Sequence, residues 1–138
     1  MLERILASTH VFLYRISNGR IGGSVHHAPV LLMTTIGRKS GKKRTRPLLY
    51  SRDGNRLVVI ASNGGRRVDP SWWTNLRHNP TAEVQMKRMK HTVYAKRASG
   101  TEKERLWRLM TNLYPPYDEY AKKTRRDIQV VLLVPKME

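Results

Sequence analysis

The chain contains no cysteine, which excludes disulfide cross-links, thiolate catalysis and cysteine-based zinc sites. Long apolar runs are absent too. The longest, Leu57–Ala61 and Val130–Val134, fall far short of the roughly 20 residues of a membrane-spanning helix. Acidic residues are scarce, since 10 Asp and Glu stand against 27 Lys and Arg. The resulting charge of +17 predicts an anionic partner, which is a nucleic acid, an anionic lipid surface or a polyanionic cofactor.

The length of 138 residues suits a single domain, 1–138, that buries its own core. The N-terminus lacks the basic stretch and long apolar segment of a signal peptide, so a cytoplasmic location is expected. His26 and His27 are neighbours, and neighbouring side chains rarely converge on one metal ion. We interpret both as ordinary loop residues and predict no metal site.

Apolar side chains recur at helical spacing over residues 1–17, which predicts an N-terminal amphipathic helix. Such a helix either packs on one side of the core or anchors the protein peripherally to an anionic membrane. The first interpretation is favoured, because few lysines and arginines lie on the polar face. The apolar face comprises Leu2, Ile5, Leu6, Thr9, Phe12, Leu13 and Ile16.

The rest of the chain is rich in strands, and strict alternation of strands and helices is absent. We therefore predict an α+β, mainly β fold: a closed or half-open antiparallel barrel of about six strands with short flanking helices. The expected strands are Val30–Ile36, Arg44–Ser51, Arg56–Ser62, Thr81–Met86, His91–Arg97 and Ile128–Val134.

Three helices are expected after the first strands. Asp69 followed by Pro70 predicts a capped helix that ends at Asn79. The Thr101–Glu104 segment matches a capping box for a helix reaching about Leu113. After Pro115 and Pro116, Tyr117–Lys123 is expected to form a short helix.

The Gly37–Arg46 segment is the clearest candidate for ligand binding. Its two glycines let the backbone bend and expose N–H groups, and Ser40 adds a hydroxyl. Such donors, together with forked guanidinium groups, are what a phosphate requires. The alternative is a solvated basic hairpin tip. The cations of the segment are Arg38, Lys39, Lys42, Lys43, Arg44 and Arg46.

Three further motifs follow. The glycines of Ser62–Gly65 would permit close approach of a flat ring or phosphate. Trp72 and Trp73 point about 100° apart on a helix, so either one faces the core while the other lines a ligand slot, or both are core aromatics. Tyr114, Tyr117 and Tyr120 are spaced by three, so they form either an apolar staple or a hydroxyl-lined pocket.

Five segments occur in order and together resemble the deazaflavin-dependent nitroreductase family. They are Thr35–Gly41, Arg44–Leu48, Ser62–Gly65, Pro70–Leu76 and Tyr114–Tyr120. The resemblance covers about residues 22–135. It implies a split β-barrel that uses coenzyme F-420, a 5-deazaflavin with a phosphate and an oligoglutamate tail. It also implies hydride transfer to a small electrophile, such as a quinone, an activated alkene or a nitroaromatic.

The resemblance further implies roles for individual residues. Tyr117 would be catalytic, would sit beside the reactive carbon and would donate a proton. Tyr114, Tyr117 and Tyr120 would line the substrate site. Lys42 and Lys43 match no family role and would only add to the attracting field. The cofactor would be held by Arg38, Lys39, Ser40, Arg44, Thr45, Arg46, Pro47, Leu48, Leu49, Ile60, Ala61, Ser62, Asn63, Ser71, Trp72, Trp73, Thr74, Asn75 and Tyr117.

Two alternatives remain open on sequence. The same barrel can bind FMN or another anion without deazaflavin turnover. A basic nucleic-acid-binding module is also conceivable, but single strands stack on exposed aromatic residues of a sheet. The sequence disfavours this module because its only phenylalanine is Phe12 and tyrosines cluster in the segment Tyr114–Tyr120. That alternative draws on cations outside the motifs: Lys87, Arg88, Lys90, Lys122, Lys123, Arg125 and Arg126.

Overall fold

The structure is a computed structural model that describes residues 2–25 and 27–136. His26 lies outside the described residues, and so do the side chains of residues 2–6 on the predicted apolar face. The helices are α1 (Leu2–Ser17), the short 3₁₀ helix η1 (Asn63–Gly65), α2 (Ser71–His78), α3 (Gly100–Leu113) and α4 (Pro116–Lys123). The strands are β1 (Ser24–Val25), β2 (Ala28–Ile36), β3 (Lys43–Leu49), β4 (Ser51–Asp53), β5 (Arg56–Ile60), β6 (Thr81–Met86), β7 (Met89–Arg97) and β8 (Val130–Pro135).

The strands form one curled antiparallel sheet in the order β1-β2-β6-β7-β8-β5-β4, with β3 paired to the free side of β2. Only Tyr50 separates β3 from β4. The Tyr50 N–H still donates to Pro29 of β2, whereas Ser51 pairs with Val58 of β5. The predicted single strand Arg44–Ser51 is therefore broken at Tyr50, where the chain changes partner. This bent segment connects the two edges of the sheet, which confirms the split-barrel prediction.

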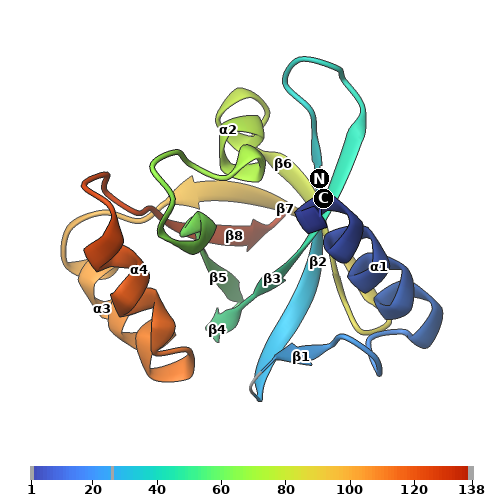
Figure 1. The fold of residues 1–138 in the computed structure, drawn as a ribbon, viewed down its shortest axis with the longest axis horizontal. Helices are drawn as coiled ribbons and strands as arrows, with labels where there is room; N and C mark the ends of the chain where they lie inside the picture. Colours follow the sequence, from blue (N-terminus) through green and yellow to red (C-terminus); the bar gives the residue numbers. More distant parts are fainter. Residues whose placement is uncertain (1, 26, 137–138) are drawn as a thin grey trace.

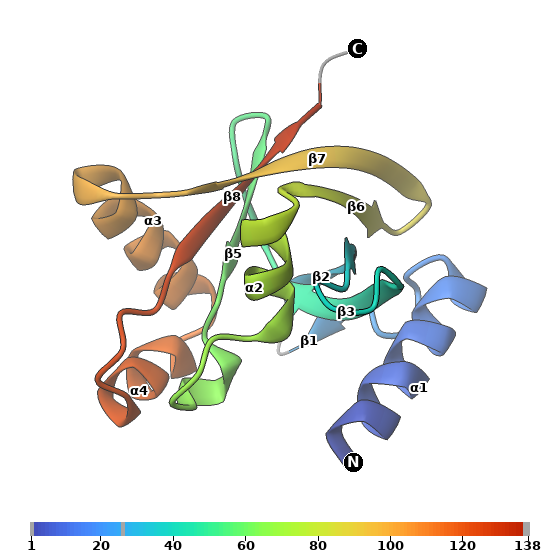
Figure 2. The same ribbon diagram turned by 90° about the horizontal axis from the view of Figure 1, so that it is seen from above.

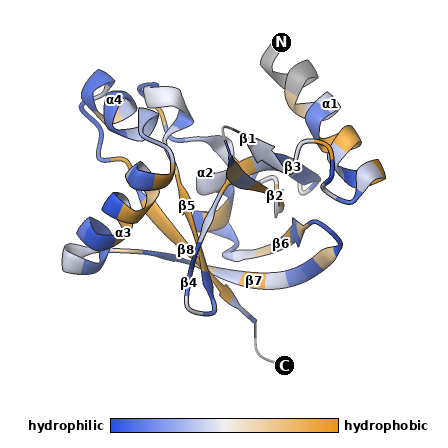
Figure 3. Ribbon diagram, turned by 90° about the horizontal axis from the view of Figure 1, so that it is seen from below, coloured by the Kyte–Doolittle hydropathy of each residue, from blue (hydrophilic) through white to orange (hydrophobic). Residues whose placement is uncertain are grey.

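Two core layers explain why Leu57–Ala61 is apolar throughout. Leu57, Val59 and Ala61 face the barrel interior, while Val58 and Ile60 pack under α3 and α4. All five are buried, as the run predicted, because both faces of the strand are covered. Figure 3 shows this apolar composition along β5 and its partner β8.

The N-terminal helix packs against the body, as favoured on sequence. Val11 and Tyr14 of α1 form a small core with Val30 and Leu32. The buried Tyr14 hydroxyl lies 3.0 Å from the Val30 carbonyl oxygen and accepts the Lys87 N–H at 2.7 Å. Figures 1 and 2 show α1 on one side of the sheet and α3 with α4 on the other. None of the described helices is both long and apolar enough to cross a membrane.

Two capping predictions are wrong. Asp69 is not the N-cap of α2, which begins after Pro70 without a side-chain cap. Its carboxylate instead pairs with two arginines, Arg126 at Oδ1 and Arg77 at Oδ2. The capping box fails as well, because α3 starts at Gly100 and Thr101 lies within its first turn.

Candidate active site

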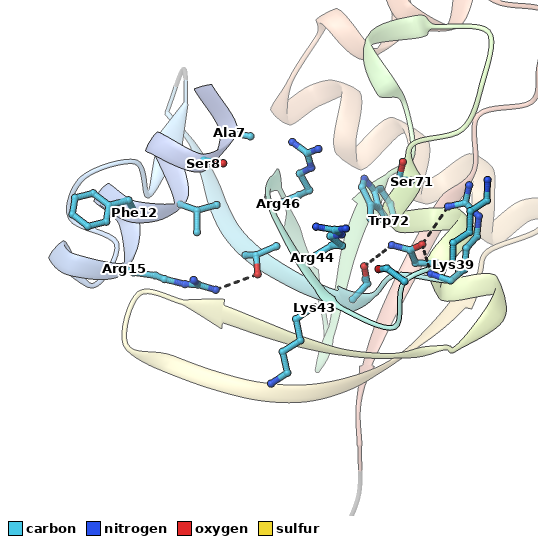
Figure 4. Close-up of a pocket in the computed structure, with 17 residues that line it drawn as sticks. Ala7, Ser8, Phe12, Arg15, Lys39, Lys43, Arg44, Arg46, Ser71 and Trp72 are labelled. Carbon is cyan, nitrogen blue, oxygen red and sulfur yellow. Dashed lines mark hydrogen bonds between the residues drawn. The ribbon is translucent and has the colours of Figure 1, made fainter. Parts of the chain in front are cut away.

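A cavity of about 600 Å³ opens between α1, the β2–β3 loop and the start of α2 (Figure 4). The three elements are far apart in sequence, and the barrel brings them together around the end of β2. The lining residues are Ala7, Ser8, Val11, Phe12, Arg15, Thr35, Gly37, Arg38, Lys39, Ser40, Lys43, Arg44, Thr45, Arg46, Ser71, Trp72 and Asn75.

The lining is strongly cationic. Among the described residues, the lining includes no acidic side chain, and a concave surface with one sign of charge concentrates its field on an anion. Lys43 lines the cavity although no family role was expected for it, whereas Lys42 does not. The cations of the lining are Arg15, Arg38, Lys39, Lys43, Arg44 and Arg46.

The β2–β3 loop is held in a defined shape by its own backbone. The Gly37 N–H donates to the Lys42 carbonyl oxygen and the Gly41 N–H donates to Gly37, both at 2.8 Å. The Ser40 hydroxyl accepts the Lys42 N–H at 3.2 Å. A Cβ at Gly37 would lie only 2.7 Å from the Ser40 Oγ, so a larger residue here would displace the Ser40 hydroxyl. The loop is thus a hydrogen-bonded basic turn, and its residues 38–44 are exposed to solvent.

Asn75 fixes this loop to the rest of the site. Its side-chain oxygen accepts the Arg38 backbone N–H at 3.2 Å and the Arg38 Nη1 at 3.3 Å. Its side-chain nitrogen donates to the Thr35 hydroxyl at 3.1 Å. Both Asn75 and Thr35 are buried, so the network is shielded from competing water. Arg38 is therefore oriented before any ligand arrives.

Sequence reasoning missed the wall formed by α1. Residues of its second and third turns line the cavity opposite the basic strand β3 (Figure 4). Arg15 donates to the Thr45 hydroxyl at 3.1 Å, and Thr45 lies 2.7 Å from the hydroxyl of its cross-strand partner Thr34. The helical periodicity predicted the helix, but nothing in it indicates which cavity the helix borders.

The two adjacent tryptophans are both core residues, and only one of them also borders the cavity. Both are buried in the barrel core, with ring centroids 6.5 Å apart in an edge-to-face arrangement. Trp72 lines the cavity and Trp73 does not. Trp72 thus presents an aromatic surface beside the cations.

The three tyrosines cluster, but they lie outside the lining of this cavity. Ring centroids are 5.0 Å apart for Tyr114 and Tyr117 and 6.2 Å apart for Tyr117 and Tyr120. Tyr117 is buried under Trp107, and this burial raises its pKa, with the neighbouring phenols adding to the effect. The pKa of Tyr114 is raised to about 12, mainly by its hydrogen bond with Tyr120 and to a lesser extent by burial. Both phenols are therefore neutral, and able to donate a proton, at pH 7.

Of the expected cofactor residues, nine line the cavity and the other ten do not. Leu48 and Ala61 pack in the barrel core, and Leu49 and Ile60 belong to the layer under α3 and α4. Thr74 donates to the Pro70 carbonyl oxygen, and Asn63 donates to that of Val68. The nine that line the cavity are Arg38, Lys39, Ser40, Arg44, Thr45, Arg46, Ser71, Trp72 and Asn75.

Arg126 supports the segment after β5, a role that sequence reasoning did not find. Its guanidinium donates to the carbonyl oxygens of Ala61 at 3.1 Å and Ser62 at 2.7 Å. It also donates to the Arg66 carbonyl oxygen at 3.0 Å and pairs with Asp69. Arg126 is thus a structural cation rather than one of the surplus surface charges.

The glycines of Ser62–Gly65 serve different purposes. A Cβ at Gly65 would lie 2.8 Å from the Tyr120 carbonyl oxygen, so this glycine allows η1 to approach α4. A Cβ at Gly64 would meet no atom within 4 Å. The sequence predicted that these glycines let a ligand come close to the backbone. At Gly65 the close neighbour is instead α4, the helix that carries Tyr117 and Tyr120.

The basic cavity and the split barrel agree with the comparisons to known proteins. The model of the F-420H(2)-dependent quinone reductase family matches residues 6–135. The chain belongs to this family. It is 37% identical over 132 residues to an F-420H(2)-dependent quinone reductase of Mycobacterium tuberculosis, with 93% of this chain and 89% of the relative covered.

Solved structures of relatives share the fold. An F-420-H2-dependent reductase, FDR-A, is 40% identical, with a TM-score of 0.70 over 76% of this chain and 93% of that one. A second structure, described as a domain-swapped dimer, is 37% identical, with a TM-score of 0.73 over 91% of this chain and 93% of that one. The family membership therefore rests on both sequence and fold.

Proposed function

We propose that this protein is an oxidoreductase that reduces a quinone, or a similar electrophile such as an activated alkene or a nitroaromatic, at the expense of reduced coenzyme F-420. When bound, the reduced cofactor supplies a hydride. The observation that carries the proposal is the cationic cavity, present in a chain of the F-420H(2)-dependent quinone reductase family.

The cavity suits the anionic part of such a cofactor. Arg44 and Arg46 lie on β3 between α1 and Trp72, where they would bind the phosphate and the carboxylates of the tail (Figure 4). Arg38 and Ser40 would add directed donors from the hydrogen-bonded turn, because a guanidinium can hold two oxygens of one phosphate or carboxylate. The α1 wall would limit access of water to these ion pairs.

We propose that the flat ring binds beside the segments Pro47–Leu49 and Ile60–Asn63. Support comes from Ile60–Asn63, which runs from the end of β5 into η1, and η1 touches the helix that carries Tyr117. Pro47–Leu49 lies at the end of β3. Arg126 would keep the backbone of this segment in place. The Tyr117 phenol, held neutral by burial, would donate the proton that accompanies reduction of the acceptor, with Tyr114 and Tyr120 beside it.

We also propose that the protein is cytoplasmic and touches an anionic membrane surface peripherally through α1. The observation in favour is the outer face of this helix, where Phe12 and Ile16 are 61% and 62% exposed. Arg15 and Arg20 lie close to them in the chain, and exposed apolar residues flanked by cations are typical of interfacial helices. Such contact would bring a lipid-soluble quinone close to the site.

Two measurements test the proposed function. Titration of the pure protein with coenzyme F-420 should give a Kd below about 100 μM, and a menaquinone analogue should then be reduced by the reduced cofactor. Binding without reduction of any quinone, alkene or nitroaromatic would reject the reductase. The absorption spectrum of freshly purified protein distinguishes FMN from coenzyme F-420 as the cofactor. A bound flavin would absorb at about 450 nm.

A further inference from the structure

A second cavity, of about 830 Å³, lies at the other end of the barrel. Its walls are the turn after α1, the start of β2, the Tyr50–Arg52 bend and the β6–β7 turn. It shares no lining residue with the first cavity. Pro29 of β2 borders the second and Thr35 of β2 borders the first, so six residues of extended strand, about 20 Å, separate them. It is therefore a separate place on the molecule.

In the part of the chain that the structure describes, the lining of this second cavity carries four cations and no carboxylate. The cations are Arg20, Arg52, Lys87 and Arg88. Among the described residues, none of the four forms an ion pair with an acidic side chain. The Arg52 guanidinium lies 3.8 Å from the sulfur of Met86 instead. Four unpaired positive charges around one concavity repel one another, and an anion of several charges would relieve that repulsion.

The cavity also has an apolar floor. Tyr50 and Met86 pack against the barrel core, and Met89, which is 56% exposed, stands at the rim. A phenol ring and thioether side chains are adaptable surfaces that stack well on flat aromatic groups. The surface thus combines charges for phosphate groups with a place for a planar ring.

Backbone strain gathers around the same cavity. Four non-glycine residues of the described chain have positive φ, and Asn18, His27 and Lys87 among them line it. Lys87, at φ 56°, is held there because its N–H donates to the buried Tyr14 hydroxyl at 2.7 Å. Its carbonyl oxygen accepts the Gln85 side chain at 2.8 Å. Strained residues that neighbouring groups hold in place are frequent at binding sites.

We infer that this cavity is a second anion-binding site, which takes a molecule with several phosphate groups and a flat ring, of the nucleoside triphosphate class. Arg20, Arg52, Lys87 and Arg88 would bind the phosphates, and the ring would lie on Tyr50 and Met86. The inference does not depend on the proposed reductase activity, because the two cavities are separate.

ATP is the probe, and the titration uses a background in which the first cavity is disabled by Arg44→Ala and Arg46→Ala. Calorimetry at about 150 mM salt should give a Kd below about 1 mM for ATP, with adenosine and tripolyphosphate each at least about tenfold weaker. In this background, Lys87→Gly with Arg88→Ala should weaken ATP binding at least about tenfold. Glycine adopts positive φ without strain, so this variant should keep its fold, which thermal unfolding checks.

The matched control is Lys96→Ala with Arg108→Ala, which removes two exposed cations that border neither cavity. It should change the ATP Kd less than about twofold. An equal loss in the control would mean that only the overall charge attracts ATP, and would overturn the site. Absence of ATP binding in the background variant, or tripolyphosphate binding as tight as that of ATP, would also contradict the inference.

Discussion

Asn75 and Arg38 are joined twice: the Asn75 side-chain oxygen accepts both the Arg38 backbone N–H, at 3.2 Å, and its guanidinium, at 3.3 Å. This pair connects helix α2 to the basic loop across 37 residues of sequence. The buried Thr35 hydroxyl completes the network by accepting from Asn75. The orientation of the Arg38 guanidinium in the cavity thus depends on Asn75, a residue that is itself uncharged.

Replacing Asn75 with leucine should therefore affect both stability and binding. Leucine fills the space but leaves the Thr35 hydroxyl and the Arg38 N–H without their partner, which costs about 1–3 kcal/mol of unfolding free energy. The Kd for coenzyme F-420 should rise about tenfold or more, as measured by fluorescence titration. His78→Ala, on the same helix, is the control and should leave the Kd unchanged, because His78 is exposed and lies outside the cavity lining.

The cations that line the cavity should matter more than their neighbours in the loop. Arg44→Ala and Arg46→Ala should each raise the coenzyme F-420 Kd about 10- to 100-fold, since each removes hydrogen bonds to a charged group. Lys42→Ala removes the same charge from a residue outside the lining, so its effect should stay within about threefold and vanish at high salt. Equal effects of all three would mean that the cavity supplies only a general field.

Tyr117→Phe should separate binding from chemistry. The ring packing under Trp107 is kept, so the coenzyme F-420 Kd should not change, whereas kcat should fall at least about 100-fold with loss of the proton donor. Because burial raises the pKa of Tyr117, its proton should stay in place between pH 7 and 9, and kcat should not fall there through this group. Tyr94→Phe, an exposed tyrosine on β7, should leave kcat as it is; unchanged turnover in Tyr117→Phe would remove the proposed role.

Arg126 and Arg125 offer a matched pair of neighbouring arginines. Arg126→Ala should lower the unfolding free energy by about 1–3 kcal/mol and speed hydrogen exchange in residues 61–69, because three carbonyl oxygens and Asp69 lose their donor. Arg125→Ala, at an exposed position, should change neither. The cofactor should also bind more weakly to Arg126→Ala if the ring lies against this segment.

Asp53 should make the fold sensitive to acid. The Arg105 guanidinium, joined by that of Arg56, holds the pKa of this carboxyl well below its usual range. A depressed folded-state pKa contributes stability above the unfolded value, near 4, and this contribution disappears as the pH falls toward the folded-state value. Urea unfolding of the wild type and Asp53→Asn should therefore differ by a constant amount from pH 6 to 8, and the difference should shrink below about pH 4.

The control for this experiment is Glu104→Gln, which removes the charge of an exposed carboxylate on helix α3. Its unfolding free energy should follow that of the wild type across the whole pH range. A difference between wild type and Asp53→Asn that persists to pH 3 would show that the ion pairs of Asp53 do not account for the acid sensitivity.

Local sequence was sufficient wherever one segment defines its own structure. The periodicity of residues 2–17, the apolar run Leu57–Ala61 and the turn glycines predicted elements that the structure confirms. The basic loop was identified for the same reason, since its cations, glycines and serine are adjacent in the chain. Family resemblance added the split barrel.

Competition between distant residues was not visible in the sequence. Asp69 looked like a helix cap, but Arg126, 57 residues away, takes its carboxylate. On sequence, Arg126 was counted among the surplus surface cations, but its guanidinium donates to three backbone carbonyl oxygens in the segment after β5. Which pairs form depends on the barrel bringing the ends of β5 and β8 together, because hydrogen bonds act only over a few ångströms.

The sequence by itself determined the charge, the order of the elements and the residues able to bind an anion, because these follow from residue type and local spacing. Only the tertiary structure decided that α1 forms one wall of the cavity, that Asn75 orients Arg38, and that Tyr50 ends one strand pairing and begins another. It also decided that cations at 20, 52, 87 and 88 surround a second cavity. These facts arise from contacts between segments, and contacts exist only once the chain has closed into the barrel.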